Sequence, residues 1–204
     1  MPEIALLLWD VGGVLLSNGW DHSARAAAAA RFGLDPAELE RRHGLVDGPF
    51  ETGRLDTEGY LSATVFYEPR SFLREEFVAF MHARSTPNPG AIATARALRA
   101  SGRYRMATLN NESRELNEYR LRSFGLRDLF DVFFSSCYTG RRKPDPDAYR
   151  FALELTQRAP DECLFLDDRP ENLEAATGLG LRTLRVLDPA RLAEDLARAG
   201  VASG

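Results

Sequence analysis

The chain has 204 residues, of which 44% are hydrophobic and 27% charged, and its formal net charge is −4. This length suits one domain, or one domain with a sizeable insertion, and it is enough to bury a hydrophobic core without disulfide bonds. A small negative charge without a basic run excludes a general attraction to nucleic acid. No apolar stretch reaches the roughly 18 residues that a membrane-spanning helix needs, so we expect no membrane partner either.

The first predicted element is a buried strand over residues 4–8, which continues into Trp9-Asp10-Val11 and is followed by Gly12 and Gly13. An ionised aspartate is costly to bury unless a cation or hydrogen bonds compensate for the lost hydration. Asp10 is therefore a candidate for chemistry at the end of a strand in an α/β sheet.

Residues 17–85 have helical patterns and lack the alternation that is typical of strands. The expected helices cover residues 24–32, residues 36 to about 42, a stretch that begins at 57, and a stretch from about 71 to 82. A glycine-spaced segment separates the second of these from the third, over residues 48–55. We therefore interpret residues 17–85 as a helical cap inserted into a core made of residues 1–16 and 86–204.

Strands and helices alternate regularly from residue 86 onward. Strands are expected over residues 104–109, 132–135, 163–166 and 183–187, and helices over residues 91–99, 114–124, 147–157, 171–177 and 190–199. Short apolar strands that alternate with helices predict a parallel sheet covered on both faces. With right-handed crossovers, the fold class is α/β, a Rossmann-like doubly wound core.

Ligands of such sheets bind outside the carboxyl ends of the strands, where several polar side chains of this chain are expected to meet. They are the three carboxylates Asp10, Asp167 and Asp168, the amine of Lys143, and the amides of Asn110 and Asn111. Hard oxygen ligands favour Mg²⁺, and three carboxylates would repel one another strongly without a cation. The amine suits a phosphoryl oxygen, and the two glycines after the first strand let backbone amides approach a bound anion.

Four segments stand in the order of the four motifs of the haloacid dehalogenase-like hydrolase superfamily. They are Asp10–Val14, Leu109–Asn111, Arg142–Asp145 and Phe165–Asp168. The insertion resembles the helical C1 cap of that superfamily. The Asp-x-Gly-Gly-Val opening and the Phe-Glu-x-Gly-x-Leu segment at residues 50–55 resemble the subgroup that contains bacterial glucose-1-phosphate phosphatase and the N-terminal phosphatase domain of soluble epoxide hydrolase.

This resemblance implies a Mg²⁺-dependent phosphomonoester hydrolase that acts on a small phosphorylated metabolite, such as a sugar phosphate. Asp10 would be the nucleophile that forms an aspartyl-phosphate intermediate. Asp10, Asp167, Asp168 and the backbone carbonyl of Gly12 would hold Mg²⁺.

The resemblance also implies residues that contact the substrate. Lys143 would pair with Asp10 and with the transferring phosphoryl group, and Asn110 takes the place where Ser or Thr usually donates to a phosphoryl oxygen. Gly13 and Asn111 would help to position the substrate or its loop. If the second strand is counted differently, Thr108 takes the motif position in place of Asn110.

Gly12 departs from the pattern of many phosphatases of this superfamily, which carry an aspartate there as general acid and base. General acid–base catalysis typically contributes about 10²–10⁴-fold to the rate. Our hypothesis is that water or an acid of the cap, such as Glu51 or Asp56, supplies this function. Glu51 is accordingly expected at the substrate.

Two other functions remain open at this point. One is a non-hydrolytic or weakly active module that binds metal or phosphate, for which Gly12 is the support. The other is a 2-haloacid dehalogenase, which would use Asp10 without a metal, would favour a residue bulkier than Gly12, and would have less need of Asp167 and Asp168. The sequence does not indicate an oligomeric state.

Cys137 and Cys163 both lie in strand-like apolar segments, and we expect them to be reduced thiols of the core. The short N-terminal apolar run has no basic region before it and is interpreted as a strand. Without a cysteine framework or an export signal, the expected location is the cytoplasm.

Overall fold

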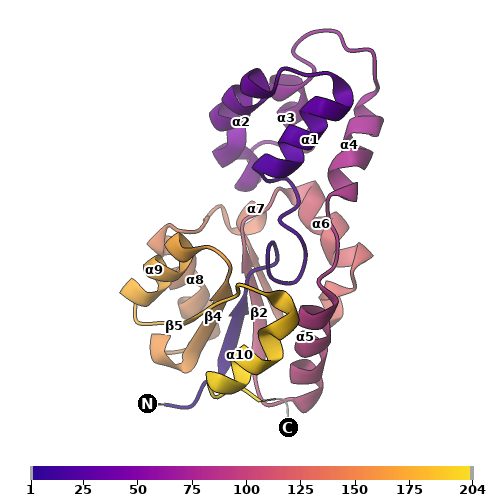
Figure 1. Ribbon diagram of the computed structural model, residues 1–204. Helices are drawn as coiled ribbons and strands as arrows, with labels where there is room; N and C mark the ends of the chain where they lie inside the picture. The colour runs from indigo at the N-terminus through magenta and orange to yellow at the C-terminus, as the bar shows by residue number, and fades with distance from the viewer. Residues whose placement is uncertain (1, 203–204) are drawn as a thin grey trace.

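The computed structural model describes residues 2–202 and contains a five-stranded sheet in the order β3-β2-β1-β4-β5 (Figure 1). All neighbouring strands are parallel. The strands are β1 (Leu6–Trp9), β2 (Arg105–Asn110), β3 (Val132–Ser135), β4 (Cys163–Asp167) and β5 (Arg182–Arg185). The predicted Rossmann-like α/β core is therefore confirmed, with β1 at the centre of the sheet.

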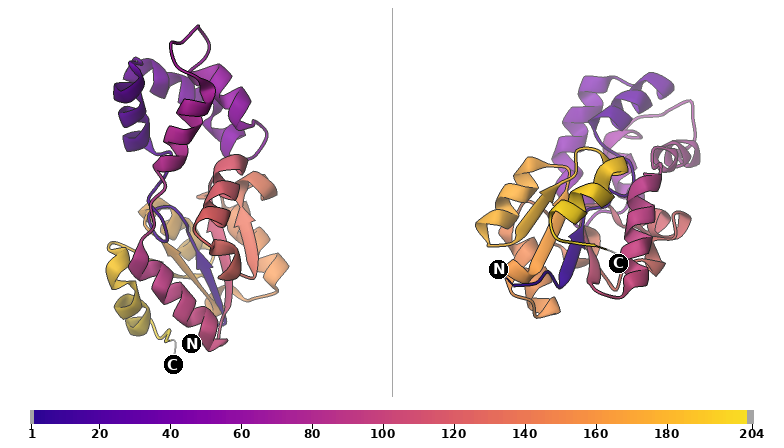
Figure 2. Two further views of the ribbon diagram at one scale, coloured as in Figure 1. Left: turned by 90° about the vertical axis from the view of Figure 1, so that its right-hand side faces the viewer. Right: turned by 60° about the horizontal axis from the view of Figure 1, so that its bottom comes forward.

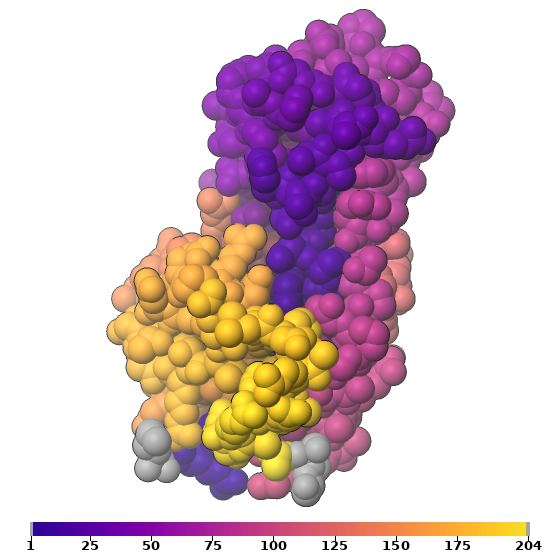
Figure 3. All heavy atoms as spheres, in the orientation of Figure 1, coloured from indigo at the N-terminus to yellow at the C-terminus, as the bar shows by residue number. Residues whose placement is uncertain are grey.

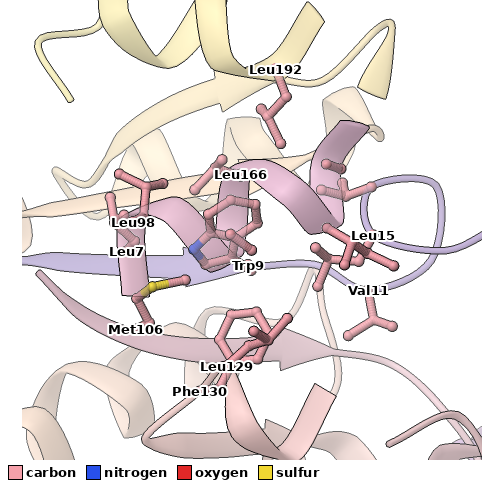
Figure 4. Close-up of a cluster of buried hydrophobic side chains, with 14 of the residues drawn as sticks. Leu7, Trp9, Val11, Leu15, Leu98, Met106, Leu129, Phe130, Leu166 and Leu192 are labelled. Atoms are coloured by element: carbon pink, nitrogen blue, oxygen red, sulfur yellow. The ribbon is translucent and has the colours of Figure 1, made fainter. Parts of the chain in front are cut away.

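Helices cover both faces of this sheet. They are α5 (Pro89–Ser101), α6 (Arg114–Ser123) and α10 (Leu192–Arg198) on one face, and α8 (Pro146–Thr156) and α9 (Pro170–Gly178) on the other. Alternate residues of β1 point to opposite faces because of the pleat of the strand. Leu7 and Trp9 pack with Leu98 of α5 and Leu192 of α10 (Figure 4), whereas Leu8 packs on the α8–α9 side. Burial on both faces explains why β1 is apolar throughout.

The remaining long helices stand as a separate lobe beyond the carboxyl ends of the strands (Figures 1 and 3). They are α1 (His22–Phe32), α2 (Pro36–Glu51), α3 (Thr57–Thr64) and α4 (Arg74–Ala83), and we call them the cap helices. The lobe has its own buried cluster, which includes Trp20, Phe50, Tyr60 and Phe77 and extends to Leu116 of α6. The cap helices are thus packed around their own core and also against one helix of the sheet layer.

Aspartates begin three of the cap helices. The carboxylate of Asp21 accepts from the backbone of Ala24, that of Asp35 from Ala37, and that of Asp56 from Gly59. Such N-cap bonds satisfy amide groups that have no partner within the helix.

Two neighbouring linkers join the cap helices to the core, as the left view of Figure 2 shows. The backbone N–H of Ser17 donates to Thr86 O at 2.8 Å, and that of Asn88 donates to Leu15 O at 2.9 Å. The linker that leads into the insertion and the linker that leads out of it are therefore hydrogen-bonded to each other.

The largest difference from the sequence-based prediction concerns α2, which does not end near Arg42. It continues across Gly44, Gly48 and Pro49 to Glu51, and so includes the first half of the glycine-spaced segment 48–55. Phe50 is buried and its ring stacks on that of Tyr60, with centroids 4.0 Å apart. Packing within the lobe thus outweighs the weak helix propensity of glycine and proline.

A short helix, α7 (Ser136–Thr139), follows β3 and was not expected. Cys137 lies in this helix and not in a strand, whereas Cys163 does begin β4; both are buried free thiols. The remaining short elements are the 3₁₀ turns Leu126–Asp128, Pro160–Glu162 and Pro189–Arg191. Within residues 2–202, we find no helix with the length and apolar character required to cross a bilayer.

Candidate active site

Three carboxylates meet where β1 and β4 end. Asp10 follows β1, Asp167 is the last residue of β4, and Asp168 comes next in the chain. Because β1 and β4 are paired neighbours, with Trp9 opposite Leu166, their carboxyl ends lie side by side. One oxygen atom from each carboxylate lies within 4.8 Å of the others. Clustered carboxylate oxygens of this kind can hold a divalent cation.

Lys143 lies between two of these carboxylates. Its Nζ is 3.0 Å from Asp10 Oδ1 and 2.6 Å from Asp167 Oδ2, and the residue is only 3% exposed. Burial lowers the pKa of Lys143, but Asp10 and Asp167 outweigh it, so that the net shift is upward. The amine is therefore a fixed cation next to the carboxylate of Asp10.

Asn111 holds the backbone of Lys143 in place. Its Nδ2 donates to Lys143 O at 2.8 Å, and its Oδ1 accepts from the backbone N–H of Lys143 at 2.9 Å. The side-chain amide thus pairs with both backbone groups of one residue. Asn111, predicted to position the substrate or its loop, is thus placed on the loop that carries Lys143.

The two carboxylates after β4 differ in how they are satisfied. Asp167 accepts from Lys143 Nζ, from the backbone of Arg169 at 2.9 Å, and from Asn172 Nδ2 at 3.0 Å on each oxygen. Asp168 Oδ2 accepts one long bond from Asn18 Nδ2 at 3.4 Å, whereas its buried Oδ1 has no hydrogen-bond partner among residues 2–202. A buried carboxylate oxygen without a donor is costly and is a natural cation ligand.

Burial and mutual repulsion change the acidity of this cluster. Burial raises the pKa of Asp10, and Lys143 opposes this shift. The pKa of Asp168 is also raised by burial and by the charge of Asp167. Three carboxylates face a single ammonium group, and a bound divalent cation would relieve the remaining repulsion. The residues present therefore fit a divalent metal ion.

Gly13 makes room for Asp168. Its φ is +74°, and a Cβ atom placed on it would lie 2.3 Å from Asp168 Oδ2. Gly12 is less confined, because its Cβ would come 3.2 Å from Asn18 Oδ1 and its φ is not in the left-handed region. The second glycine of the pair is thus required by both backbone conformation and space.

A cavity of about 450 Å³ opens onto this cluster between the core and the cap helices. The core contributes Asp10, Gly12, Asn111, Glu112 and Lys143, and the cap region contributes Trp20, His43, Asp47, Phe50 and Glu51. A pocket of this size suits a small molecule.

The predicted cap residue Glu51 does reach this cavity, and the unexpected length of α2 explains why. Asp47 and Glu51 are one turn apart and lie 3.2 Å and 3.1 Å from Nη1 of Arg142. Ser136 Oγ donates to the backbone carbonyl of Glu51 at 2.6 Å. Burial raises the pKa of Glu51, while Arg142 opposes the shift. The end of α2 is therefore attached to the loop that carries Lys143.

The other predicted positions lie elsewhere. Asn110 is buried, its Nδ2 donates to Asn117 Oδ1 at 3.2 Å, and its Oδ1 accepts from Ser135 Oγ at 2.9 Å. Thr108 is fully buried within the sheet, and Asp56 serves as the N-cap of α3. Within the part of the chain that the structure describes, none of these three lines the cavity.

Several charged residues of this cavity were not selected from the sequence, and Arg142, Glu112 and Arg120 are among them. Arg142 precedes Lys143 directly, and Glu112 follows the Asn110-Asn111 pair, so both stand beside predicted motifs. Arg120 lies within α6, and its Nη1 is 3.0 Å from Glu112 Oε2. Its position in a charged helical stretch carries no local signal of burial.

The sequence matches the haloacid dehalogenase-like hydrolase family over residues 4–180. It is 31% identical to a phosphatase of Mycobacterium tuberculosis over 90% of this chain and 88% of that protein. It is 28% identical to flavin mononucleotide hydrolase 1 of Arabidopsis thaliana, a chloroplast protein, over 98% of this chain and 79% of the relative. A 32% identical match to bifunctional epoxide hydrolase 2 of Rattus norvegicus covers 63% of this chain but only 24% of that protein.

Among solved structures, a haloacid dehalogenase family enzyme of Bacteroides thetaiotaomicron, in complex with magnesium and inorganic phosphate, superimposes with a TM-score of 0.73. The superposition covers 93% of this chain and 98% of that enzyme at 19% sequence identity. At this identity, the likeness establishes a shared fold.

Proposed function

Because this chain belongs to the haloacid dehalogenase-like hydrolase family, we propose that it hydrolyses the phosphomonoester of a small metabolite with Mg²⁺ and an aspartyl-phosphate intermediate on Asp10. The observation that carries this proposal is the placement of Asp10 between a buried ammonium group and a carboxylate oxygen that has no donor. Relatives named as phosphatases and as a mononucleotide hydrolase support the substrate class.

In this proposal, Asp10 attacks the phosphorus atom while Lys143 holds a phosphoryl oxygen and the attacking carboxylate in line. Asp10, Asp168 and the carbonyl of Gly12 would hold Mg²⁺. The ion would supply electrostatic stabilisation of the charge on the transferring phosphoryl group. The sequence predicts Asp167 in the same ligand set, but its four hydrogen bonds favour a different task, the fixing of Lys143.

The backbone at Gly13 would support the phosphoryl site, and Asn111 would act by holding Lys143. The buried Asn110 would act only indirectly, through the contacts of its side chain with Asn117 and Ser135. Glu51 would contact the leaving group together with Arg142, because the two are paired and line the same cavity as Asp10. A wall that contains His43, Asp47 and Glu51 suits a polar leaving group such as a sugar. The buried free thiols support a location in the cytoplasm.

The test compares wild type with Asp10→Asn on p-nitrophenyl phosphate, with Mg²⁺ and with a chelator. We expect turnover that requires the metal and disappears in the variant, followed by a screen of phosphorylated metabolites to identify the substrate. Mg²⁺ binding without turnover on a broad panel of phosphates would instead indicate a binding module. Consumption of chloroacetate without a metal would indicate a dehalogenase.

A further inference from the structure

The glycine at position 12 leaves the proposed phosphatase without an acid at the place where many relatives carry one. A Cβ atom on Gly12 would point into a polar space, 3.2 Å from Asn18 Oδ1 and 3.8 Å from Arg120 Nη1. A side chain at this position would therefore lie against Asn18, with the guanidinium group of Arg120 next to it.

That guanidinium group holds a carboxylate. Arg120 Nη1 donates to Glu112 Oε2 at 3.0 Å, and the backbone N–H of Ser113 donates to Glu112 Oε1 at 3.0 Å. Glu112 is only 8% exposed and lines the same cavity as Asp10 and Gly12. An acid from the loop after β2 is thus hydrogen-bonded to the guanidinium group that lies beside position 12.

Arg120 is itself fixed, so the position of Glu112 does not depend on a mobile side chain. Its Nε donates to Ser85 Oγ at 3.0 Å, and its Nη2 donates to the backbone carbonyl of Ser17. Gly19 passes over the guanidinium group with φ at +71°, and a Cβ atom there would lie 2.5 Å from Nη2. The backbone N–H of Glu112 is held by Ser136 Oγ at 3.0 Å.

The charges around Glu112 allow it to carry a proton near neutrality. Burial raises its pKa to about 7; Arg120 and the hydrogen bonds from Ser113 oppose this shift, and the charge of Glu51 adds to it. A phosphate dianion that enters the cavity would favour the protonated carboxyl further. A catalytic acid works best when its pKa lies near the working pH.

Glu51 is the competing acid, and its surroundings differ. Its carboxylate and the paired guanidinium of Arg142 have side chains 34% and 39% exposed, so water and the leaving group can rearrange this pair. It also belongs to the cap helices, whereas Asp10 and Glu112 both belong to the core. Of these two acids, Glu112 is the one that the sheet holds in a fixed relation to the proposed nucleophile.

We propose that Glu112 is the acid–base residue of this site and replaces the acid that is missing at Gly12; the inference rests on the proposed phosphatase function. Asp10 attacks phosphorus and the P–O ester bond breaks, while the Glu112 carboxyl gives its proton to the departing oxygen, which leaves as an alcohol. The Glu112 carboxylate then takes a proton from the water that attacks the aspartyl phosphate. Inorganic phosphate and the Asp10 carboxylate are released, and Glu112 is protonated again.

The experiment measures kcat/KM of wild type and Glu112→Gln on p-nitrophenyl phosphate and on an alkyl phosphate such as glycerol 2-phosphate. Glutamine keeps an oxygen for Arg120, so the fold is expected to persist. An alkoxide is a far stronger base than p-nitrophenolate, so its departure depends much more on protonation by an acid. We therefore expect kcat/KM to fall about 10²–10⁴-fold for the alkyl ester and less than about 10-fold for the aryl ester. Glu112→Asp should recover part of the loss.

Glu115→Gln is the matched control, because Glu115 begins α6 outside the cavity and bonds to Thr57; both substrates should be unaffected. Glu51→Gln should lower both rates without a difference between leaving groups. Equal losses on both esters in Glu112→Gln, or no loss at all, would overturn the role of Glu112, as would a leaving-group difference that appears in Glu51→Gln instead. A wild type without metal-dependent turnover on either ester would overturn the phosphatase function as well.

Discussion

The core and the cap helices both line one cavity, but they hold their charged side chains in different ways. In the core, Lys143 and Asp167 form an ion pair that is almost completely removed from solvent. On the cap side, Asp47 and Arg142 form a longer pair whose side chains are 35% and 39% exposed. The core pair is preorganised, whereas the pair at the cap can exchange its partners with a substrate at little cost.

This difference separates two tasks within one site. Groups whose geometry must not change during the reaction come from adjacent strand ends, where Asp10 and Asp167 follow paired strands. In the proposed phosphatase, the groups that would meet the variable part of a substrate come from α2, which belongs to a lobe with its own buried cluster. Substitutions that change the shape of the lobe can therefore leave the strand ends unchanged.

The largest expected effect comes from removing Asp10, the proposed nucleophile of the core. Asp10→Asn keeps the volume of the side chain but cannot form an acyl phosphate as a carboxylate does, so kcat should fall by about 10⁴-fold or more. Steady-state kinetics measure the loss, and circular dichroism confirms that the variant is folded. Substantial residual turnover would contradict the assignment of chemistry to the strand ends.

The second effect compares two neighbouring cations. Lys143→Met removes the partner of two buried carboxylates and should destabilise the protein by about 3–5 kcal/mol in chelator. Arg142→Met removes a partly exposed pair and should cost only about 0–1 kcal/mol. Urea unfolding of both variants measures the difference. Equal losses would show that the cap-side pair is as rigid as the core pair.

The third effect concerns the space for Asp168. Gly13→Ala places a methyl group against this carboxylate at a positive φ. We therefore expect the free energy of unfolding to fall by about 1–2 kcal/mol and the affinity for Mg²⁺ to fall about 10–100-fold. Gly102→Ala is the control, because Gly102 also has a positive φ of +64° but no atom within 4 Å of its Cβ position. Isothermal titration with Mg²⁺ should separate the two, and a similar affinity in both variants would argue against Asp168 as a ligand.

The smallest effect is a pH dependence located in the cap helices. Burial lowers the pKa of His43 from 6.5 to about 4, and its Nδ1 lies 3.0 Å from the hydroxyl of Tyr60. A depressed pKa means that this stabilisation is present above about pH 6.5 and is lost as the pH falls toward 4. Urea titrations at pH 7 and pH 5 measure how much the free energy of unfolding falls on acidification. His43→Gln should make this fall smaller by about 1 kcal/mol.

His22→Gln is the control for this titration, because the His22 side chain is 78% exposed. In the core, the pH dependence of stability has the opposite sign. The raised pKa of Glu112 makes its stabilisation complete below about pH 4.5 and lost as the pH rises through about 7. An acid effect that is unchanged in His43→Gln would show that it does not originate in the lobe.

The position of each strand of the core could be predicted within one or two residues, because short apolar runs bounded by glycine and proline are local signals. The carboxylate cluster could be predicted too, since the carboxyl ends of parallel strands share one edge of the sheet. The end of α2 was predicted wrongly: the stack of Phe50 on Tyr60 keeps a glycine- and proline-containing stretch helical. Helix propensity is a property of single residues and takes no account of such a tertiary contact.

The amino-acid sequence by itself determined the order of the strands along the chain, the α/β class, and the presence of Asp10, Asp167 and Asp168 at strand ends and of Lys143 in the loop that precedes α8. These features follow from periodicity and from residue types that neighbour one another in the chain. Only the tertiary structure decided that Arg142 joins α2 and that Arg120 holds Glu112 beside the linkers. Burial and charge pairing there depend on segments far apart in the chain, as in the contact of Arg120 with Ser17 across 103 positions.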